Sequence, residues 1–413
     1  MRKSKRKALL GVLIIVVLVL CIGLFTKNKT NTLNTTSINK ESTSKEFDEN
    51  LIGAYIQNGD DYTPTSDIPT SGYEFNAEKS YCKIGDAIQE DMTLFYDMDT
   101  QTLTVSPIAK EGTKCYLYFD EKASGGDYIL AGDNPPTNST TDWTGKESYY
   151  YTGNPNNWVQ FAGFWWRIIR INGDGSIRMI YSGSDATGPA TSGTDTQIGT
   201  DVFNGSYDQN AYVGYMYGDI YANDYAGTHA NTNSSNIKGV LDNWYKNTIA
   251  HKRFRDYVDG NSGFCGDRRV SSGTGGGTSS TDYQPFTRVN NNSPSLSCNT
   301  NDIYTTKESS TGNKALTYSI GLISADESML AGISNWNSSG NTNNYLYTGQ
   351  NYWTMSPSYY SGDAIVLCVL SDGSLNNYYV GDAAPGVRPV INIRANVEIT
   401  GSGTTSDPFV VVS

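Results

Sequence analysis

Apolar and polar positions separate most sharply at the N-terminus. Residues 1–7 are strongly basic, residues 8–25 are apolar throughout, and polar residues return from Thr26. A helix over 8–25 is long enough to cross a bilayer, and the basic flank favours the cytoplasmic side. We therefore expect residues 1–25 to form a signal anchor, a single transmembrane helix with the rest of the chain outside the cytoplasm. A cleaved signal peptide and a lipoprotein signal at Cys21 stay open as alternatives, and both also place the body outside the cytoplasm.

The chain after the apolar run changes from polar to β-patterned. Residues 26–50 are rich in Asn, Thr, Ser and Lys and bury too little apolar surface to become ordered, so we expect a flexible stalk. Residues 51–119 hold short apolar runs between turn residues, and Leu103 and Val105 alternate with threonines. This period is typical of half-buried strands and predicts a small β-rich module over 51–119. Residues 120–157, rich in Gly, Ser, Thr and Pro, are expected to be a linker.

The main domain, expected over 158–413, begins with a clear hairpin signal. Two β-rich runs, 159–171 and 177–181, are joined by Asn-Gly and Asp-Gly steps, which favour tight turns. Trp165 and Trp166 fall on opposite faces, and both faces carry bulky side chains. We therefore expect the hairpin to lie inside a sheet and not at its edge.

Two helices are predicted in this domain. Ser234 or Ser235 can cap the first, whose apolar residues repeat at three- and four-residue steps over 237–249. The second, a short one, begins at Ser324, and Glu327 three residues later completes a capping box.

The rest of the domain is expected to be loop and strand. Residues 271–280 are glycine-rich but lack the Gly-Lys-Ser/Thr of a phosphate-binding loop, so we expect a flexible loop. Pro389 has no backbone donor and indicates an edge or a bulge in the last strand. The strands expected in the C-terminal third cover residues 352–356, 364–370, 375–380 and 386–393.

The cysteines fit an oxidising compartment. Proximity in sequence favours two disulfides, Cys82–Cys115 and Cys265–Cys298, although spacing alone does not determine connectivity. Cys368 lies in an apolar strand, where a free thiol behaves as a small hydrophobe. There is no Cys/His cluster for zinc, and we expect neither a metal nor a cofactor.

Composition narrows the classes of function. With 30 basic against 42 acidic residues the net charge is -12, which argues against a nucleic-acid binder. Tyr (30) far outnumbers Phe (12) and Trp (7), as in strands with wet, half-buried surfaces. Only two histidines are present, His229 in a polar loop and His251 at a helix end, and no catalytic motif accompanies either. We expect a protein that is not an enzyme.

The carboxylates leave one catalytic alternative open. Asp326 and Glu327 are explained by the helix cap, and Asp174 and Asp372 by turns. A tethered hydrolase that uses a carboxylate pair stays as an alternative.

The order of the motifs resembles an uncharacterised family of extracytoplasmic bacterial domains with a C-terminal Gly-Val-Arg-Pro-Val strand. That family in turn is similar to the formylglycine-generating-enzyme branch of the C-type lectin-like fold, and the resemblance covers residues 159–393. It implies an α+β domain: a twisted antiparallel sheet with two helices and long loops. The branch's copper-binding cysteine pair and the lectins' calcium motifs have no match here, so neither chemistry carries over. The motifs are Phe-Trp-Trp-Arg-Ile-Ile (164–169), Leu-Asp-Asn-Trp-Tyr (241–245), Gly-Leu-Ile-Ser-Ala-Asp-Glu (321–327), Tyr-Trp-Thr-Met-Ser-Pro (352–357), Leu-Ser-Asp-Gly-Ser-Leu (370–375) and Gly-Val-Arg-Pro-Val (386–390).

Aromatic and Asn-rich segments of the C-terminal third supply the candidate ligand contacts, since Tyr and Asn are the residues of adaptable binding faces. We expect structural roles for Trp166, Trp353 and Arg388, with Arg388 paired to an aspartate because an unpaired buried charge is costly. The candidate contact residues, expected in exposed loops or turns, are Tyr359, Tyr360, Asp363, Asn376, Asn377 and Tyr378.

Together these patterns predict a single-pass cell-surface protein of the cell membrane, or a secreted one if the signal is cleaved. Its distal domain is expected to bind a surface glycan or a protein without catalysis, in adhesion or recognition. A structural envelope spacer without a specific ligand is the second hypothesis, and the tethered hydrolase is the third.

Overall fold

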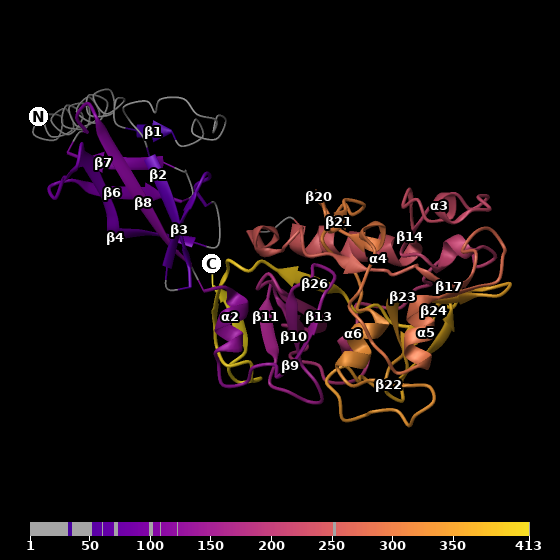
Figure 1. The fold of residues 1–413 in the computed structure, drawn as a ribbon. Coiled ribbons are helices and arrows are strands. Elements are labelled where there is room, and N and C mark those ends of the chain that lie inside the picture. The colour runs from indigo at the N-terminus through magenta and orange to yellow at the C-terminus, as the bar shows by residue number, and fades with distance from the viewer. Residues whose placement is uncertain are drawn as a thin grey trace, which may run out of the picture. The chain divides into compact units, whose positions relative to one another are not determined.

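The computed structural model describes residues 32–34, 52–59, 61–69, 73–98, 102–107, 109–121, 123–250 and 253–412. The chain divides into two compact units, Met1–Lys122 and Ala123–Ser413, built mostly of β-sheet with few helices (Figure 1). The predicted anchor lies outside the described residues, and so does the predicted stalk except for a short strand, Thr32–Asn34. No helix in the described part of the chain has the length and apolar character to cross a membrane.

Two sheets form the first unit, which is the predicted β-rich module. Leu103 and Val105 are buried in its core, as their alternation with threonines predicts. The predicted disulfide Cys82–Cys115 joins residues that face each other on neighbouring strands. One sheet has the order β3 (Asp61–Thr65), β2 (Ile52–Asn58), β8 (Thr113–Glu121), β4 (Tyr73–Ile84), β5 (Ala87–Ile88), and the other β1 (Thr32–Asn34), β7 (Thr102–Ser106), β6 (Thr93–Asp97).

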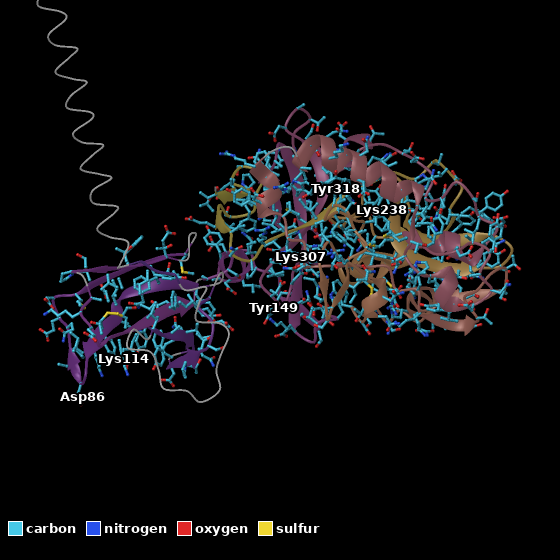
Figure 2. The ribbon with its side chains drawn as sticks, turned by 90° about the horizontal axis from the view of Figure 1, so that it is seen from above. Asp86, Lys114, Tyr149, Lys238, Lys307 and Tyr318 are labelled. Carbon is cyan, nitrogen blue, oxygen red and sulfur yellow. A yellow bond between two sulfur atoms is a disulfide. The ribbon has the colours of Figure 1, made fainter. Side chains whose placement is uncertain are left out.

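The face of the five-stranded sheet that points away from this core carries tyrosines. The Tyr55 and Tyr118 rings stack at 4.9 Å between centroids. Gly53 makes room for such a ring, because a Cβ there would lie 3.3 Å from Cδ1 of Tyr116. Each cross-strand aromatic pair stabilises a sheet by roughly 0.2–1 kcal/mol. Lys114, labelled in Figure 2, lies on the same strand as Tyr116 and Tyr118.

An eight-stranded sheet opens the second unit. The predicted hairpin is strands β12 (Phe164–Ile171) and β13 (Ile177–Ser184), and both lie inside the sheet, as expected. The run 159–171 is two strands, because Ala162 and Gly163 take positive φ values and turn the chain between β11 and β12. Pro389 lies just before the edge strand β26, in agreement with its prediction. The order is β26 (Val390–Ile393), β13 (Ile177–Ser184), β12 (Phe164–Ile171), β11 (Trp158–Phe161), β28 (Phe409–Val412), β27 (Glu398–Thr400), with β10 (Glu147–Tyr150) on β12 and β9 (Asn138–Thr141) on β10.

A six-stranded sheet carries the C-terminal third. Strand β23 (Tyr352–Tyr360) includes residues 357–360, expected in a loop. Neither large sheet is purely antiparallel: β11 pairs with β28, and β22 with β25, in parallel. The order is β17 (Val270–Gly273), β18 (Thr281–Tyr283), β23 (Tyr352–Tyr360), β24 (Ala364–Val369), β25 (Ser374–Tyr379), β22 (Ser334–Asn335). The two-stranded pairs are β14 (Met216–Tyr217) with β15 (Asn233–Ser234), β16 (Phe264–Cys265) with β19 (Ile303–Tyr304), and β20 (Glu308–Ser309) with β21 (Gly312–Asn313).

Both predicted helices are present. Helix α4 (Asn236–Tyr245) has Ser235 as its N-cap and continues as a π-helical turn. Helix α6 (Ala325–Leu330) has the capping box of Ser324 and Glu327. The π-helical turn after α4 is Lys246–Ala250, which overlaps the predicted range 237–249. The helices that the sequence did not predict are α2 (Gly125–Leu130), α3 (Tyr225–Thr228) and α5 (Gln284–Asn290), with short turns at Thr194–Thr196, Asn210–Val213, Arg253–Tyr257 and Thr300–Asp302.

The segment 120–157, expected to be a linker, is folded from residue 123 onward as part of the second unit. It supplies α2, β9 and β10, and Gly126 lies so close to the hairpin turn that a Cβ there would be 2.5 Å from the Gly175 carbonyl oxygen. Gly125 and Gly126 therefore serve close packing and not flexibility.

The glycine-rich loop at 271–280 is also fixed in place. The Asn210 side-chain amide donates hydrogen bonds to the carbonyl oxygens of Gly276, Gly277 and Ser279, and Gly275 N donates to the Thr281 hydroxyl. The expectation of a flexible loop is wrong, because a distant side chain supplies the donors that the loop's carbonyls need.

The remaining cysteines agree with their predictions. Cys265 and Cys298 form the second disulfide, and Cys368 is a buried free thiol on β24.

Replacing Gly126 tests whether the former linker is part of the fold. We expect Gly126→Ala to lower the free energy of unfolding of the second unit by about 1–3 kcal/mol, since the new methyl group overlaps the Gly175 carbonyl. Gly239→Ala in α4 is the matched control: a Cβ there meets nothing within 4 Å, so it should stabilise by about 1 kcal/mol. All seven tryptophans lie in the second unit, so tryptophan fluorescence during urea unfolding reports on it alone. If Gly126→Ala left the free energy of unfolding unchanged, the close packing of this segment would be contradicted.

Candidate functional site

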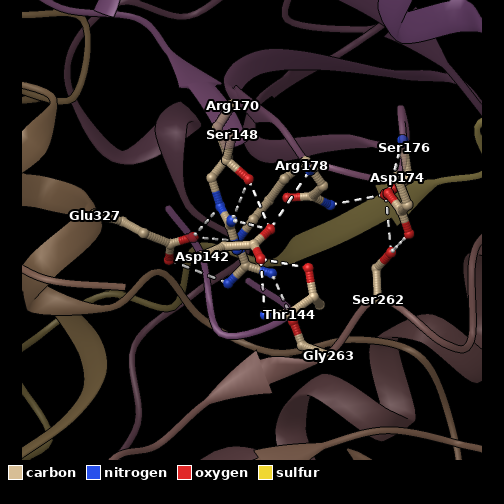
Figure 3. A network of polar contacts seen from close by, with 12 residues as sticks. Asp142, Thr144, Ser148, Arg170, Asp174, Ser176, Arg178, Ser262, Gly263 and Glu327 are labelled. Carbon is tan, nitrogen blue, oxygen red and sulfur yellow. Dashed lines mark hydrogen bonds and ion pairs between the residues drawn. The ribbon is translucent and has the colours of Figure 1, made fainter. Parts of the chain in front are cut away.

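A buried polar network centres on Glu327, the capping residue of α6 (Figure 3). Its Oε1 lies 3.1 Å from Arg170 Nε on β12, and its Oε2 accepts a hydrogen bond of 3.1 Å from Arg178 Nη2 on β13. Arg170 also faces Asp142, whose Oδ2 is 3.8 Å from Nη1 and accepts a 2.7 Å hydrogen bond from Ser148. At most 4% of any of these charged side chains is exposed, so the network lies in the core.

The hydrogen-bond and ion-pair partners in this network lower the pKa values of its two carboxylates. Burial raises the pKa of Glu327, but Arg178 and Arg170 outweigh burial and hold that pKa below its usual value. Burial also raises the pKa of Asp142, and the hydrogen bonds from Thr144 and Ser148 outweigh it. Both carboxylates are thus ionised and occupied by protein donors, so this network joins α6 to the hairpin instead of receiving a ligand.

The carboxylates considered for hydrolysis have structural partners. Arg288 holds Asp326 through two hydrogen bonds of 2.7 Å. Asp174 and Asp372 accept hydrogen bonds from the backbone of the turns they begin, as the sequence predicts. Burial, reinforced by Arg268, holds the pKa of His229 well below its usual value. His251 lies outside the described residues.

Arg388 is fully buried, but its partner is not an aspartate. The guanidinium donates to the main-chain carbonyl oxygens of Tyr181, Thr196 and Leu346 and lies 4.7 Å from the centroid of the Tyr352 ring. The expected ion pair is wrong because three chain segments bring carbonyl oxygens to this point, and a guanidinium has enough donors for all of them.

The two tryptophans with expected structural roles are fully buried. Trp166 Nε1 donates to the Phe161 carbonyl oxygen at 3.0 Å, and Trp353 Nε1 donates to that of Asp201 at 2.8 Å.

Five of the six candidate contact residues lie in strands and not in loops. Tyr359 and Tyr360 end β23, and Asn376, Asn377 and Tyr378 belong to β25. The turn-forming Ser and Pro residues that suggested a loop are accommodated by irregular pairing between β23 and β24.

Their side chains make contacts within the protein. Tyr360 is 2% exposed and its hydroxyl donates to the Asp208 carbonyl oxygen at 2.9 Å, so it is a core residue. The Tyr378 ring packs against Trp353, and the half-buried Tyr359 ring packs against Phe286. Asn377 accepts a hydrogen bond from the Ser358 hydroxyl.

Asp363, the sixth candidate, lines a surface hollow of ≈ 430 Å³. Tyr207 and Tyr379 also line it, and they are 51% and 59% exposed. Gly381, Asp382 and Ala383 complete the lining. We call these six residues the tyrosine hollow.

Backbone contacts bring the two sides of the tyrosine hollow together. The amide of Ala364, next to Asp363, donates to the Tyr207 carbonyl oxygen at 2.7 Å. Gly381 lies close beneath Tyr207, since a Cβ there would be 3.2 Å from Cδ1 of that ring. Tyr379 directly follows the candidate run Asn376-Asn377-Tyr378. No pattern in the sequence around Tyr207 marks it as a candidate, and only the tertiary structure brings it to this site.

The tyrosine hollow offers two aromatic rings and two carboxylates. In the described part of the chain, the Asp363 carboxylate has no hydrogen-bond or ion-pair partner, and Asp382 accepts one bond from the Ala384 amide at 2.9 Å. Such a set can stack on an apolar ring face and accept hydrogen bonds from hydroxyl or ammonium groups.

No protein-family model, curated protein or solved structure matches this chain.

Removing the central carboxylate tests the buried network. We expect Glu327→Gln to lower the free energy of unfolding of the second unit by about 3–5 kcal/mol, because Arg170 and Arg178 lose their common partner in the core. Glu398→Gln, at an exposed residue of β27, is the control and should change stability by less than about 0.5 kcal/mol. Equal effects of the two substitutions in urea unfolding would show that the network contributes nothing.

The lowered pKa values predict how stability responds to acid. Asp142 and Glu327 bind protons more weakly in the folded chain, so the unfolded chain is protonated first as pH falls. Their contribution is complete above the ordinary Glu value of 4.5 and is lost as pH falls through the folded pKa values. We expect the difference in unfolding free energy between wild type and Glu327→Gln to shrink as the pH is lowered from about 6 to about 3, because Glu327 loses its charge over this range. A difference that stays constant with pH would contradict the assignment.

Proposed function

We propose that this protein is anchored in the cell membrane by its N-terminus and binds a surface glycan or protein through its second unit, without catalysis. We further propose that this unit has the C-type lectin-like fold that its motif order resembles. The observation that carries the proposal is the tyrosine hollow.

Three properties of the tyrosine hollow support binding. Its ≈ 430 Å³ falls within the roughly 300–1,000 Å³ of ligand pockets. Tyr207 and Tyr379 expose more than half of their surface, although tyrosine rings in the rest of this unit are mostly covered. Tyrosine gives rigid contact area at low entropic cost, which is why binding faces use it.

The disulfides support a location outside the cytoplasm. Cys82–Cys115 and Cys265–Cys298 are formed in separate units, and disulfides persist in oxidising compartments.

A binding screen with matched variants tests the proposal. The full chain, purified in mild detergent, is applied to an array of glycans and surface proteins. We expect a reproducible ligand whose binding falls at least tenfold in the Tyr207→Ala/Tyr379→Ala double variant, with an unchanged Tm. Tyr221→Ala is the control, because Tyr221 is 82% exposed and does not line the hollow.

The same screen separates the alternatives. A double variant that keeps full binding would contradict this site, and a blank array with a folded protein would favour the spacer hypothesis. Tyr360→Ala serves as a contrast: because that side chain is core, it should lower Tm and leave the ligand preference intact.

A further inference from the structure

We propose that the tyrosine hollow recognises an amino sugar with a free amine, as part of a glycan. This inference rests on the proposed function and names the ligand chemistry of that site.

Unpaired negative charge is the first argument. Several buried carboxylates elsewhere in this unit have basic partners: Asp326 is held by Arg288, and Asp302 by Arg268. Neither Asp363 nor Asp382 has an ion-pair partner in the described part of the chain, and no Lys, Arg or His lines the hollow. Two carboxylates beside one concave surface attract a cation and oppose an anionic ligand.

The aromatic rings also favour a positively charged ligand. A cation over a tyrosine face gains roughly 0.5–1 kcal/mol at an exposed site. Tyr207 lies just before the short turn Asn210–Val213 and Tyr379 ends β25, so the two rings come from segments far apart in the sequence. Gly381 and Ala383 add little side-chain bulk to the lining.

The size of the hollow favours a sugar over a lysine side chain. A single aliphatic amine would leave much of the ≈ 430 Å³ to water and could satisfy one carboxylate. A pyranose ring with an ammonium group presents an apolar face for a tyrosine and several hydroxyl donors for the second carboxylate. A basic peptide is therefore the competing ligand, and calorimetric titration distinguishes it from an amino sugar by affinity.

Calorimetric titration of the full chain tests the inference with three probes: a glucosamine tetramer, its N-acetylated counterpart and a short oligolysine peptide. We expect the free-amine tetramer to bind at least tenfold tighter than either other probe. Its affinity should fall at least tenfold in Asp363→Asn/Asp382→Asn and stay within twofold in the control Glu398→Gln. Tryptophan fluorescence and Tm show whether each variant is folded.

The outcomes separate this inference from the proposed function. Equal affinity for the acetylated tetramer, tighter binding of oligolysine, or no binding of the free-amine tetramer would each overturn the amino-sugar assignment. If the array ligand is nevertheless lost in Tyr207→Ala/Tyr379→Ala, the proposed function stands. If that double variant keeps its ligand, both proposals fail.

Discussion

The second unit depends on one buried carboxylate. Glu327 binds arginines from both strands of the central hairpin, and the same helix donates a hydrogen bond from Ala325 N to Ser356 on β23. Helix α6 thus joins the eight-stranded and the six-stranded sheets. Leaving any of these charges without a partner in the core would cost several kcal/mol, so the hairpin and the helix are stable only together.

The tyrosine hollow shows the opposite use of charge. In the core, Glu327, Asp326 and Asp302 are each paired with arginine, which leaves them unavailable to a ligand. Asp363 and Asp382 lie at the surface, where water solvates a carboxylate at little cost, and their charge stays available. Because no basic residue lines the tyrosine hollow, these two carboxylates present a negatively charged surface to a ligand.

A glycine-rich segment can be a flexible linker or a closely packed part of the fold, and local composition does not distinguish the two. The segment around Gly126 and the loop around Gly276 have the composition of flexible linkers. In the structure both are packed: Gly126 touches the turn at Gly175, and Gly276 is bound by Asn210. Each contact joins residues far apart in the sequence, and the missing side chain is what permits the close approach.

The sequence by itself determined the features whose causes are local. The hairpin turn at 172–176, the cap at Ser235 and the capping box at Ser324 each depend on residues within a few positions, so spacing reveals them. Only the tertiary structure decided that Tyr360 is buried, that Arg388 binds carbonyl oxygens, and that Tyr207 meets Tyr379. These outcomes depend on which distant segments pack together, and no periodicity of neighbouring residues encodes that packing.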